Sequence, residues 1–488
     1  MVSARPGRPP VQNAIGTHRL DDRIEQHGSF GTYVVVLRCT WWIGMLQGLR
    51  RDRRVCSPLD PAGPARTWVR RMSSNPVLAR PRRHRRRSSA QPPSPPALSE
   101  TFAAASHHVL LTATLALLAL GLTMILSASS VDSIARGRSP FALALEQGRY
   151  ALIGLVVLAV ASRVPIRAYR RAAAPVLLVA LGLQLLVHTP LAVGDGVRRS
   201  WIAIGPVSGQ PAELLKIGLV LWLGAVLARR VHRIGDWRTA AFPALPGACL
   251  AIALTLLGHD VGTSLVMATL VAAALFVAGA PLRLFAAAGA GAAVAFVGLA
   301  LAAPRRVQRI SDWLGGDCDP LGSCYQTTQG LRALGSGGWT GVGLGQSRQK
   351  WSYLPEAHND FIFAIVGEEL GVLGMLLVLA LVGALAFAMI RVVARHTDPF
   401  ARIVTGGVLG WLLAQALVNI GTVIGLAPVI GVPLPLVSAG GSSLVTTLLA
   451  IGIVLSFART EPGAPEALAS RPGVLRRSGA VLGRRRRT

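Results

Sequence analysis

Long apolar segments separated by short polar connections fill most of the chain after residue 108. A membrane-spanning helix needs about 20 predominantly apolar residues. The segments of about this length are residues 109–129, 149–164, 173–189, 212–228, 242–258, 262–279, 283–303, 359–390, 401–427 and 435–457. This pattern predicts an all-α polytopic membrane protein of about ten transmembrane helices, with a long extracytoplasmic loop between the seventh and the eighth.

The two ends of the chain have a different pattern. Residues 1–105 and 459–488 are rich in Arg, Pro and Ser or in Arg alone, a composition that buries too little apolar surface to fold. We therefore predict disordered, basic, cytoplasmic regions on either side of a membrane domain at residues 106–458. The apolar stretch "YVVVLRCTWWIGML" is too short to span and carries Arg38. Because Met72 begins a stretch typical of a natural start, residues 1–71 are a candidate misassigned extension.

Composition and charge agree with the apolar pattern. The 488 residues are 52% hydrophobic and only 15% charged, whereas soluble domains contain about a quarter charged residues. The net charge of +28 comes from arginines in the two terminal regions and in a few short loops. Such a distribution is typical of cytoplasmic loops that face anionic lipid, and it argues against nucleic acid as a partner.

Charge also predicts the orientation of the helices. With the N-terminus inside, the loops that contain "SRVPIRAYRRAA", "ARRVHRIGDWRTA", "GAPLRL" and "RVVARHTDPFAR" are basic and cytoplasmic, and the C-terminus is also inside. The long loop at 304–358 is then extracytoplasmic. Cys318 and Cys324 lie in it, where they either form a disulfide or stay reduced.

The segment "LPEAHNDFIFAIVGEELG" carries the clearest candidate chemistry. If a helix begins near Pro355, Glu356 and Asp360 share a face at the outer membrane boundary. Glu368 and Glu369 are deeper, where a charge costs at least about 2.5 kcal/mol, so they must be paired, protonated or turned to the bundle interior. For this glutamate pair we favour a structural role over a functional one. Asp360 lies where water and a substrate head group both reach, and we favour a functional role.

A second polar cluster lies in "RRSWIAIGPVSGQPAELLK". Arg199 and Trp201 precede an apolar segment in which Glu213 and Lys216 are three residues apart and share a helix face. Two interpretations stay open. One is an internal ion pair with an interfacial tryptophan, and the other is a cationic cradle for phosphate.

Other segments add candidates that bind substrate. Asp260 in "GHDVG" is either a turn residue or functional, and Arg348 and Lys350 form a basic pair near Asp360 in sequence. The glycine-rich "GSGGWTGVGLG" precedes this pair and is a candidate to close over a ligand.

The last apolar segment begins irregularly, with Pro, Gly and Ser in "GVPLPLVSAGGSSL". Irregular backbone at membrane depth is tolerated where it lines a cavity, so Ser438 and Ser442 are candidates. The chain contains no Walker motif, no dinucleotide fingerprint and no metal-ligand spacing. We therefore identify no cofactor, and a divalent cation stays open without a ligand pattern.

Five segments taken together resemble the SEDS family (shape, elongation, division and sporulation). They are "RRSWIAIGPVSGQPAELLKI", "GHDVGTSLV", "CYQTTQGLRALGSGG", "GVGLGQSRQKWSYLPEAHNDFIFAIVGEELG" and "GVPLPLVSAGGSSL". The resemblance runs from about residue 109 to residue 458 and is stronger to the cell-division (FtsW-like) branch than to the elongation (RodA-like) branch. It implies ten spans and a peptidoglycan glycosyltransferase that polymerises lipid II with a class B penicillin-binding transpeptidase and other cell-division membrane proteins.

The resemblance also assigns residues. The essential aspartate of the family's H-T-D-F-I-F motif falls on Asp360, and the lysine of its S-E-L-x-K motif falls on Lys216. The tryptophan of R-R-W-I falls near Trp201, although Ser200 is inserted before it. Ala439 replaces the usual tyrosine of the last motif. None of these departures removes a titratable group that we assign to the chemistry.

These observations lead to one favoured function and two alternatives. The favoured one is lipid II polymerisation at the outer face of the bacterial cytoplasmic membrane, at the division septum. Asp360 would be the general base, and Arg348 and Lys216, with Lys350 and Arg199, the cations for the leaving pyrophosphate. The alternatives are a lipid II flippase, which would need polar groups through the full membrane depth, and a division scaffold without catalysis.

Overall fold

The computed structural model describes residues 105–190, 192–193, 200–204, 207–301, 322 and 324–465. The chain divides into two compact units, Met1–Ser89 and Ala90–Thr488, and all described residues lie in the second. The predicted disordered region at 1–105, the candidate extension at 1–71 and most of the tail at 459–488 lie outside the described residues. These assignments stay predictions.

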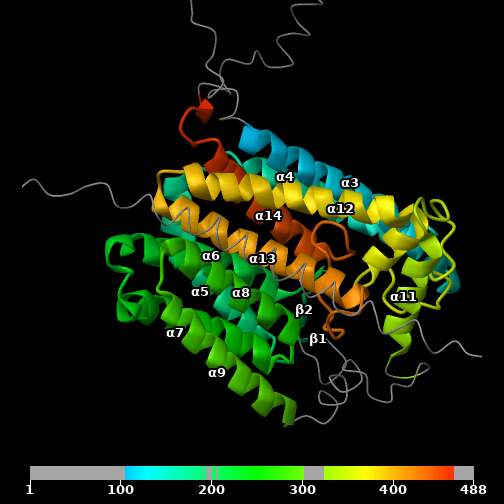
Figure 1. Ribbon diagram of the computed structural model, residues 1–488, viewed down its shortest axis with the longest axis horizontal. Coiled ribbons are helices and arrows are strands. Elements are labelled where there is room, and N and C mark those ends of the chain that lie inside the picture. Colours follow the sequence, from blue (N-terminus) through cyan, green and yellow to red (C-terminus); the bar gives the residue numbers. More distant parts are fainter. Residues whose placement is uncertain are drawn as a thin grey trace, which may run out of the picture. The chain divides into compact units, whose positions relative to one another are not determined.

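Helices account for nearly all regular structure of the second unit (Figure 1). They are α3 (Ala105–Ala135), α4 (Ala142–Ala161), α5 (Ile166–Leu186), α6 (Pro211–Ala228), α7 (Trp237–Leu257), α8 (Val261–Ala278), α9 (Leu282–Leu301), α11 (Tyr325–Gly337), α12 (Ile362–Arg395), α13 (Pro399–Val423) and α14 (Gly441–Ala458), with a 3-10 turn at Val231–Arg233. Each of the ten apolar segments coincides with one of these helices. Among the described residues, eight helices are long and apolar enough to span a membrane, and α7 and α9 contain shorter apolar stretches.

The helices form a bundle whose centre is α6, α13 and α14. The most extensive contacts join α13 to α8, α14 to α4, α5 to α6 and α12 to α3, and α3 and α12 run side by side in Figure 1. α4 has a different environment on its outer face, where Leu152 and Val160 are 66% and 61% exposed. Since large apolar side chains face lipid as readily as protein, this exposed face is suited to hydrocarbon.

A small sheet interrupts the all-helical pattern between α5 and α6. It contains β1 (Ala192–Val193), β2 (Trp201–Ile204) and β3 (Val207–Gly209) in antiparallel order β1-β2-β3. Ile202 pairs with Ala192 on one side and with Gly209 on the other. The sequence analysis did not predict this sheet. It fixes the position of Trp201 immediately before α6 begins.

α12 is broken near its start. Gly371 has φ 67° and ψ −162°, a conformation that interrupts the helix and that glycine adopts without strain. The glycine-rich segment at residues 338–345 fills the break through its backbone. Val342 N donates to Glu368 O at 2.9 Å, and Val372 N donates to Gly338 O at 3.0 Å. The segment that we expected to close over a ligand therefore packs against α12 instead.

The same break holds the two buried glutamates of α12. Glu368 accepts hydrogen bonds from Ser347 Oγ at 2.6 Å and from Arg348 N at 2.9 Å. Glu369 Oε1 accepts one from Ser127 Oγ at 2.6 Å and lies 3.4 Å from Lys350 Nζ. Both carboxylates are at most 1% exposed. They therefore bind α3 and the connection before α12 to α12 itself.

Two glycines of α11 provide a test of how closely α11 packs against α12. A Cβ on Gly337 would lie 1.9 Å from Gly367 O of α12, whereas a Cβ on Gly335 would meet nothing within 4 Å. We expect Gly337→Ala to lower the free energy of unfolding by about 1–3 kcal/mol, because backbone must move to admit the methyl group.

The matched control is Gly335→Ala, which should be neutral or stabilising by up to about 1 kcal/mol, since alanine is the better helix former. Thermal unfolding of the purified protein in detergent measures both variants. Equal effects of the two substitutions would contradict the docking.

Candidate functional site

A cavity of about 520 Å³ lies where several helix ends meet. Its walls come from α4, from β2 and the start of α6, from the start of α8, from α13, and from the connections that precede α12 and α14. Asp360, Trp201, Glu213, Asp260, Glu356 and Ser442, all predicted from sequence, line it. The structure thus brings together six candidates that are up to 241 positions apart between Trp201 and Ser442.

The backbone beside Asp360 is fixed by the C-terminal part of the chain. Asn419 Nδ2 of α13 donates to Asp360 O at 2.7 Å. Ser438 Oγ donates to Asn359 O at 2.7 Å, and Ala439 N donates to His358 O at 3.0 Å. Three consecutive carbonyls are therefore satisfied by three donors from one region. We call this arrangement the carbonyl clamp.

The clamp clarifies the irregular sequence before α14. Ser438 does not line the cavity. It is 5% exposed, and its hydroxyl also accepts from Leu434 N at 2.8 Å. The replacement of the family's tyrosine by Ala439 costs the clamp nothing, because the backbone N–H of that residue is the donor. Ser442 lines the cavity and accepts from Gln210 N at 3.3 Å.

The turn that carries Asp360 differs from our prediction. We expected a helix from about Pro355, but α12 begins at Ile362 and the preceding residues form turns. Glu356 has φ 53°, and Phe361 N donates to its carbonyl at 3.2 Å. The prediction was wrong because tertiary hydrogen bonds of the clamp use the carbonyls that a helix would need. Glu356 and Asp360 nevertheless both line the cavity.

His358, which we did not place in the site, also lines the cavity. Burial lowers the pKa of His358 below its usual value, and the nearby Glu356 carboxylate opposes that shift only in part. The imidazole is therefore neutral at neutral pH, so it can donate one hydrogen bond and accept another.

Asp260 joins two walls of the cavity. It is the N-cap of α8, with its Oδ1 accepting from Thr263 N at 3.0 Å. Its Oδ2 accepts from Gln210 Nε2 at 2.6 Å, immediately before α6. The interpretation as a turn residue is confirmed, and because Asp260 also lines the cavity its functional role stays a prediction.

Lys216 lies beneath the cavity rather than in its wall. It is 1% exposed, its Nζ donates to Glu213 Oε1 at 2.8 Å, and it stacks 4.3 Å from the centre of the Trp411 ring. Glu213 Oε2 accepts from Thr446 Oγ1 at 2.9 Å. The internal ion pair is therefore present, and Glu213 is the member of the pair that lines the cavity.

The two basic candidates near Asp360 in sequence also lie elsewhere. Lys350 is 6% exposed and donates to Gly345 O at 2.5 Å while pairing with Glu369. Arg348 is exposed and contacts Glu368 through its backbone. Neither lines the cavity, since Gly345 and Glu369 hold Lys350 and Glu368 holds the backbone of Arg348.

Two further predictions involve residues outside the described ranges. Arg199 lies outside the described residues, next to Ser200, which lines the cavity. Cys324 is disulfide-bonded, but Cys318 also lies outside the described residues, so the pairing of these two stays a prediction.

Sequence reasoning missed a polar patch at the start of α4. Glu146, Gln147 and Tyr150 line the cavity, and Gln147 Oε1 accepts from Gly440 N at 3.1 Å. The sequence "LEQGRY" carries the signal, since a cluster of polar residues begins an otherwise apolar span. Gln415 in the middle of α13 is a second example of a polar residue in an apolar helix.

The charge of the cavity wall is unusual. Among the residues that the structure describes, five carboxylates line it and no Lys or Arg does. The five are Glu146, Glu213, Asp260, Glu356 and Asp360. Within the same described ranges, no group of three or more His, Cys, Asp or Glu side chains is placed to hold a metal ion. An anionic substrate would therefore need positive charge from another source.

Comparison with known proteins gives consistent matches across the helical unit. Residues 108–462 match the family described as cell cycle protein, FtsW/RodA/SpoVE. The chain is 39% identical over 363 residues to the probable peptidoglycan glycosyltransferase FtsW of Mycobacterium tuberculosis, covering 74% of this chain and 69% of the relative. It is 38% identical over 355 residues to stage V sporulation protein E of Bacillus subtilis, covering 72% and 96%.

Solved structures show the same similarity. One is a chain of a peptidoglycan synthase complex described for its structural coordination of polymerization and crosslinking, with TM-score 0.59, 29% identity and coverage of 72% of this chain and 96% of that one. Another is the rod shape determining protein RodA of Thermus thermophilus, with TM-score 0.52, 27% identity and the same coverages.

The pair beneath the cavity gives a stability prediction. Lys216→Met should lower the free energy of unfolding by about 3–5 kcal/mol, because it leaves the Glu213 carboxylate buried without its cation. The double variant Glu213→Gln/Lys216→Met should recover most of this loss. Thermal unfolding in detergent measures the cycle. Additive effects of the two single substitutions would contradict the coupling.

Proposed function

Because the chain belongs to the FtsW/RodA/SpoVE family of cell cycle proteins, we propose that it is a peptidoglycan glycosyltransferase that polymerises lipid II for septal wall synthesis. In this reaction a sugar hydroxyl of one lipid-linked disaccharide attacks the anomeric carbon of another. The new glycosidic bond forms as the bond to undecaprenyl pyrophosphate breaks. The hydroxyl must lose its proton, and the leaving pyrophosphate must find positive charge.

We assign the proton transfer to Asp360, and the single observation that carries this assignment is its place in the cavity. The residue lines the wall, while the carbonyl clamp fixes the backbone on which its carboxylate stands. A base positioned by rigid elements is held ready to accept the proton. The cavity volume of about 520 Å³ lies within the usual range for sites that enclose a small-molecule ligand.

The other carboxylates suit the recognition of sugars. Glu356, Asp260 and Glu213 accept hydrogen bonds from hydroxyl groups, and Trp201, 39% exposed at the cavity, offers a face for sugar packing. This acidic wall also explains why the pyrophosphate needs a separate cationic region. We assign that role to Arg199, which directly precedes Ser200 of the cavity wall in the sequence. A divalent cation bound with the pyrophosphate would supply charge in the same place.

We further propose the cellular setting. Basic connections follow α4, α6, α8 and α12, which favours a cytoplasmic location for these helix ends and for both termini. The cavity lined by Asp360 lies at the opposite helix ends, on the outer side of the membrane. The substrate would then be lipid II on the outer face of the bacterial cytoplasmic membrane. A class B penicillin-binding transpeptidase is the proposed partner, in line with the similarity to a chain of a peptidoglycan synthase complex. The division septum is the proposed location.

The first experiment replaces Asp360 by asparagine in the purified full chain and supplies lipid II with the partner transpeptidase. Loss of a general base reduces rates by about 10²–10⁴-fold, so we expect glycan chains to fall to near background. The matched control is Asp236→Asn at the N-cap of α7, where asparagine caps as well as aspartate. Near-normal polymerisation by the Asp360 variant would refute the assignment.

A second experiment separates the two candidate cations. Arg199→Gln should lower kcat/KM for lipid II by about tenfold or more, as expected when a charge-assisted contact to phosphate is lost. Arg348→Gln removes the same charge from a residue that does not line the cavity, and it should have little effect. The opposite ranking of the two variants would place the pyrophosphate near α12 instead.

A further inference from the structure

A second cavity lies at the other end of α6. Glu213 in the first turn of α6 lines the Asp360 cavity, whereas Arg229 immediately after the helix lines the second one. The 18 residues of α6 extend about 27 Å, so the two cavities are at opposite ends of the bundle. The second cavity has a volume of about 380 Å³.

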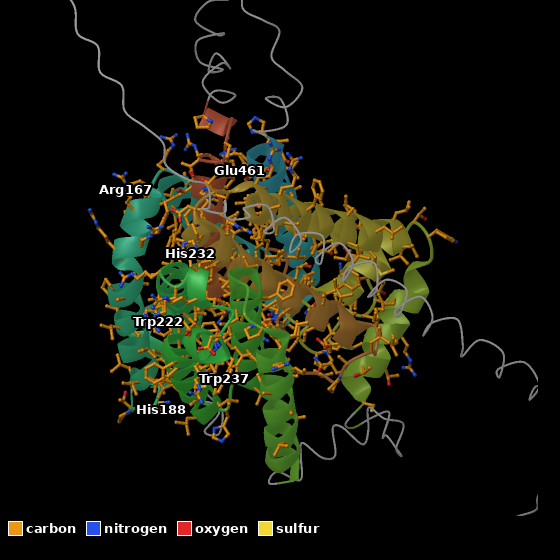
Figure 2. The ribbon with its side chains drawn as sticks, turned by 60° about the vertical axis from the view of Figure 1, so that its left-hand side comes forward. Arg167, His188, Trp222, His232, Trp237 and Glu461 are labelled. Carbon is orange, nitrogen blue, oxygen red and sulfur yellow. The ribbon has the colours of Figure 1, made fainter. Side chains whose placement is uncertain are left out.

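Small side chains create this space. Ala173 and Ala174 of α5 face Ala225 of α6 across it. Trp222 forms part of its wall and packs on α7, where a Cβ on Gly247 would lie 2.5 Å from the indole. The inner part of the cavity is therefore apolar. Figure 2 shows Arg167 at one end of α5 and His188 at the other, so the cavity belongs to the Arg167 end.

The rim of the cavity is strongly basic. Arg167, Arg170 and Arg171 come from the first turns of α5, and Arg229 comes from the end of α6. Arg170 is paired, because its Nη2 donates to both oxygens of Asp398 at 2.7 and 2.8 Å. For the other three, no salt bridge to a carboxylate occurs within the described part of the chain. The rim thus carries four guanidinium groups, of which only that of Arg170 is paired with a carboxylate.

The backbone adds to this positive potential. α5 begins after Pro165 with no side chain capping its first N–H groups. The free N–H groups of a helix start attract anions, and acidic residues normally occupy that place. Here the first turns carry three arginines instead. Arginine is favoured for phosphate because its planar fork binds two oxygens at once.

We propose that this cavity binds the phosphate head group of an anionic membrane lipid. The arginines at the rim hold the phosphate oxygens, and the lipid chains leave along the outer face of α5. That face is apolar and open, with Leu178 68% and Val179 59% exposed. The anionic head group of a lipid matches the basic rim of the cavity, and its apolar chains match the outer face of α5. The site is independent of the polymerisation chemistry, and its occupant would hold α5 and α6 together.

The test compares two triple variants of the full chain, purified in a neutral detergent. The first replaces the unpaired cavity arginines, Arg167, Arg171 and Arg229, by glutamine. The second replaces Arg230 and Arg233 in the connection after α6 and Arg238 at the start of α7, and none of these three lines the cavity. Both lose three charges. Short-chain phosphatidylglycerol, phosphatidylcholine and inorganic phosphate are the probes, and native mass spectrometry measures what stays bound.

We expect the unchanged protein to retain phosphatidylglycerol in preference to phosphatidylcholine. The cavity variant should bind it about tenfold or more weakly, since each basic residue near an anionic lipid contributes several-fold to affinity. The control variant should bind as the unchanged protein does. Equal loss in both triple variants would overturn the proposal, because it would show attraction to the basic face in general.

Two further measurements test whether the shape of the cavity matters as well as its charge, and whether the ligand is a lipid rather than a free anion. Ala174→Phe fills the cavity without changing any charge, so it should also weaken phosphatidylglycerol binding. A cooperative thermal unfolding transition, measured without lipid, shows that this variant is folded. Undiminished binding in this variant would contradict the cavity as the site. If inorganic phosphate competes as well as the lipid at equal concentration, the acyl chains contribute nothing and the lipid assignment is wrong.

Discussion

The carbonyl clamp is the constraint on which the rest of the site depends. His358, Asn359 and Asp360 present three consecutive carbonyls, and Ala439, Ser438 and Asn419 satisfy them. These residues are partly buried, and a carbonyl that loses its donor on burial costs about 1–3 kcal/mol, so the three donors stabilise this turn. The clamp thereby joins α13 and the connection before α14 to the residue that we assign to proton transfer.

A second support lies on the other side of the same turn. The break in α12 at Gly371 admits the glycine-rich segment, and the buried Glu368 and Glu369 fix the residues that lead towards Asp360. Lys350 compensates one of these charges. A charged pair of this kind stabilises the protein little by itself, but removing one partner is costly. The turn is consequently held by the three donors of the clamp and, through the residues that precede it, by hydrogen bonds and one ion pair to Glu368 and Glu369.

The helices could be predicted from the sequence because apolar length is a local signal, and all ten apolar segments coincide with helices. The need to pair Glu368 and Glu369 could also be predicted, from the cost of a charge in hydrocarbon. Their partners could not, since Ser347 and Ser127 are brought to them by tertiary packing. The helix expected at Pro355 was wrong for the same reason.

The composition of the site was only partly predictable. Motif residues such as Trp201 and Asp260 proved to share one cavity, but Lys216 and Lys350 proved to be buried in ion pairs, and Arg348 does not line the cavity. Residues that are close in sequence, such as Lys350 and Asp360, can have different surroundings, one in a buried ion pair and the other in the cavity wall, and sequence distance does not predict which. The arginines of the basic cavity are visible in the sequence as a basic loop, but the acidic wall and the cavity itself follow from the packing of helices.

The most direct measurement of the central claim is the rate of glycan formation by Asn419→Leu, which keeps the Asp360 carboxylate and removes one donor of the clamp. A misplacement of about 1 Å can cost about 10²-fold in rate, so the account predicts a fall of about tenfold or more in a protein that still unfolds cooperatively. A near-normal rate from lipid II in this variant would contradict the claim that the clamp positions the catalytic carboxylate.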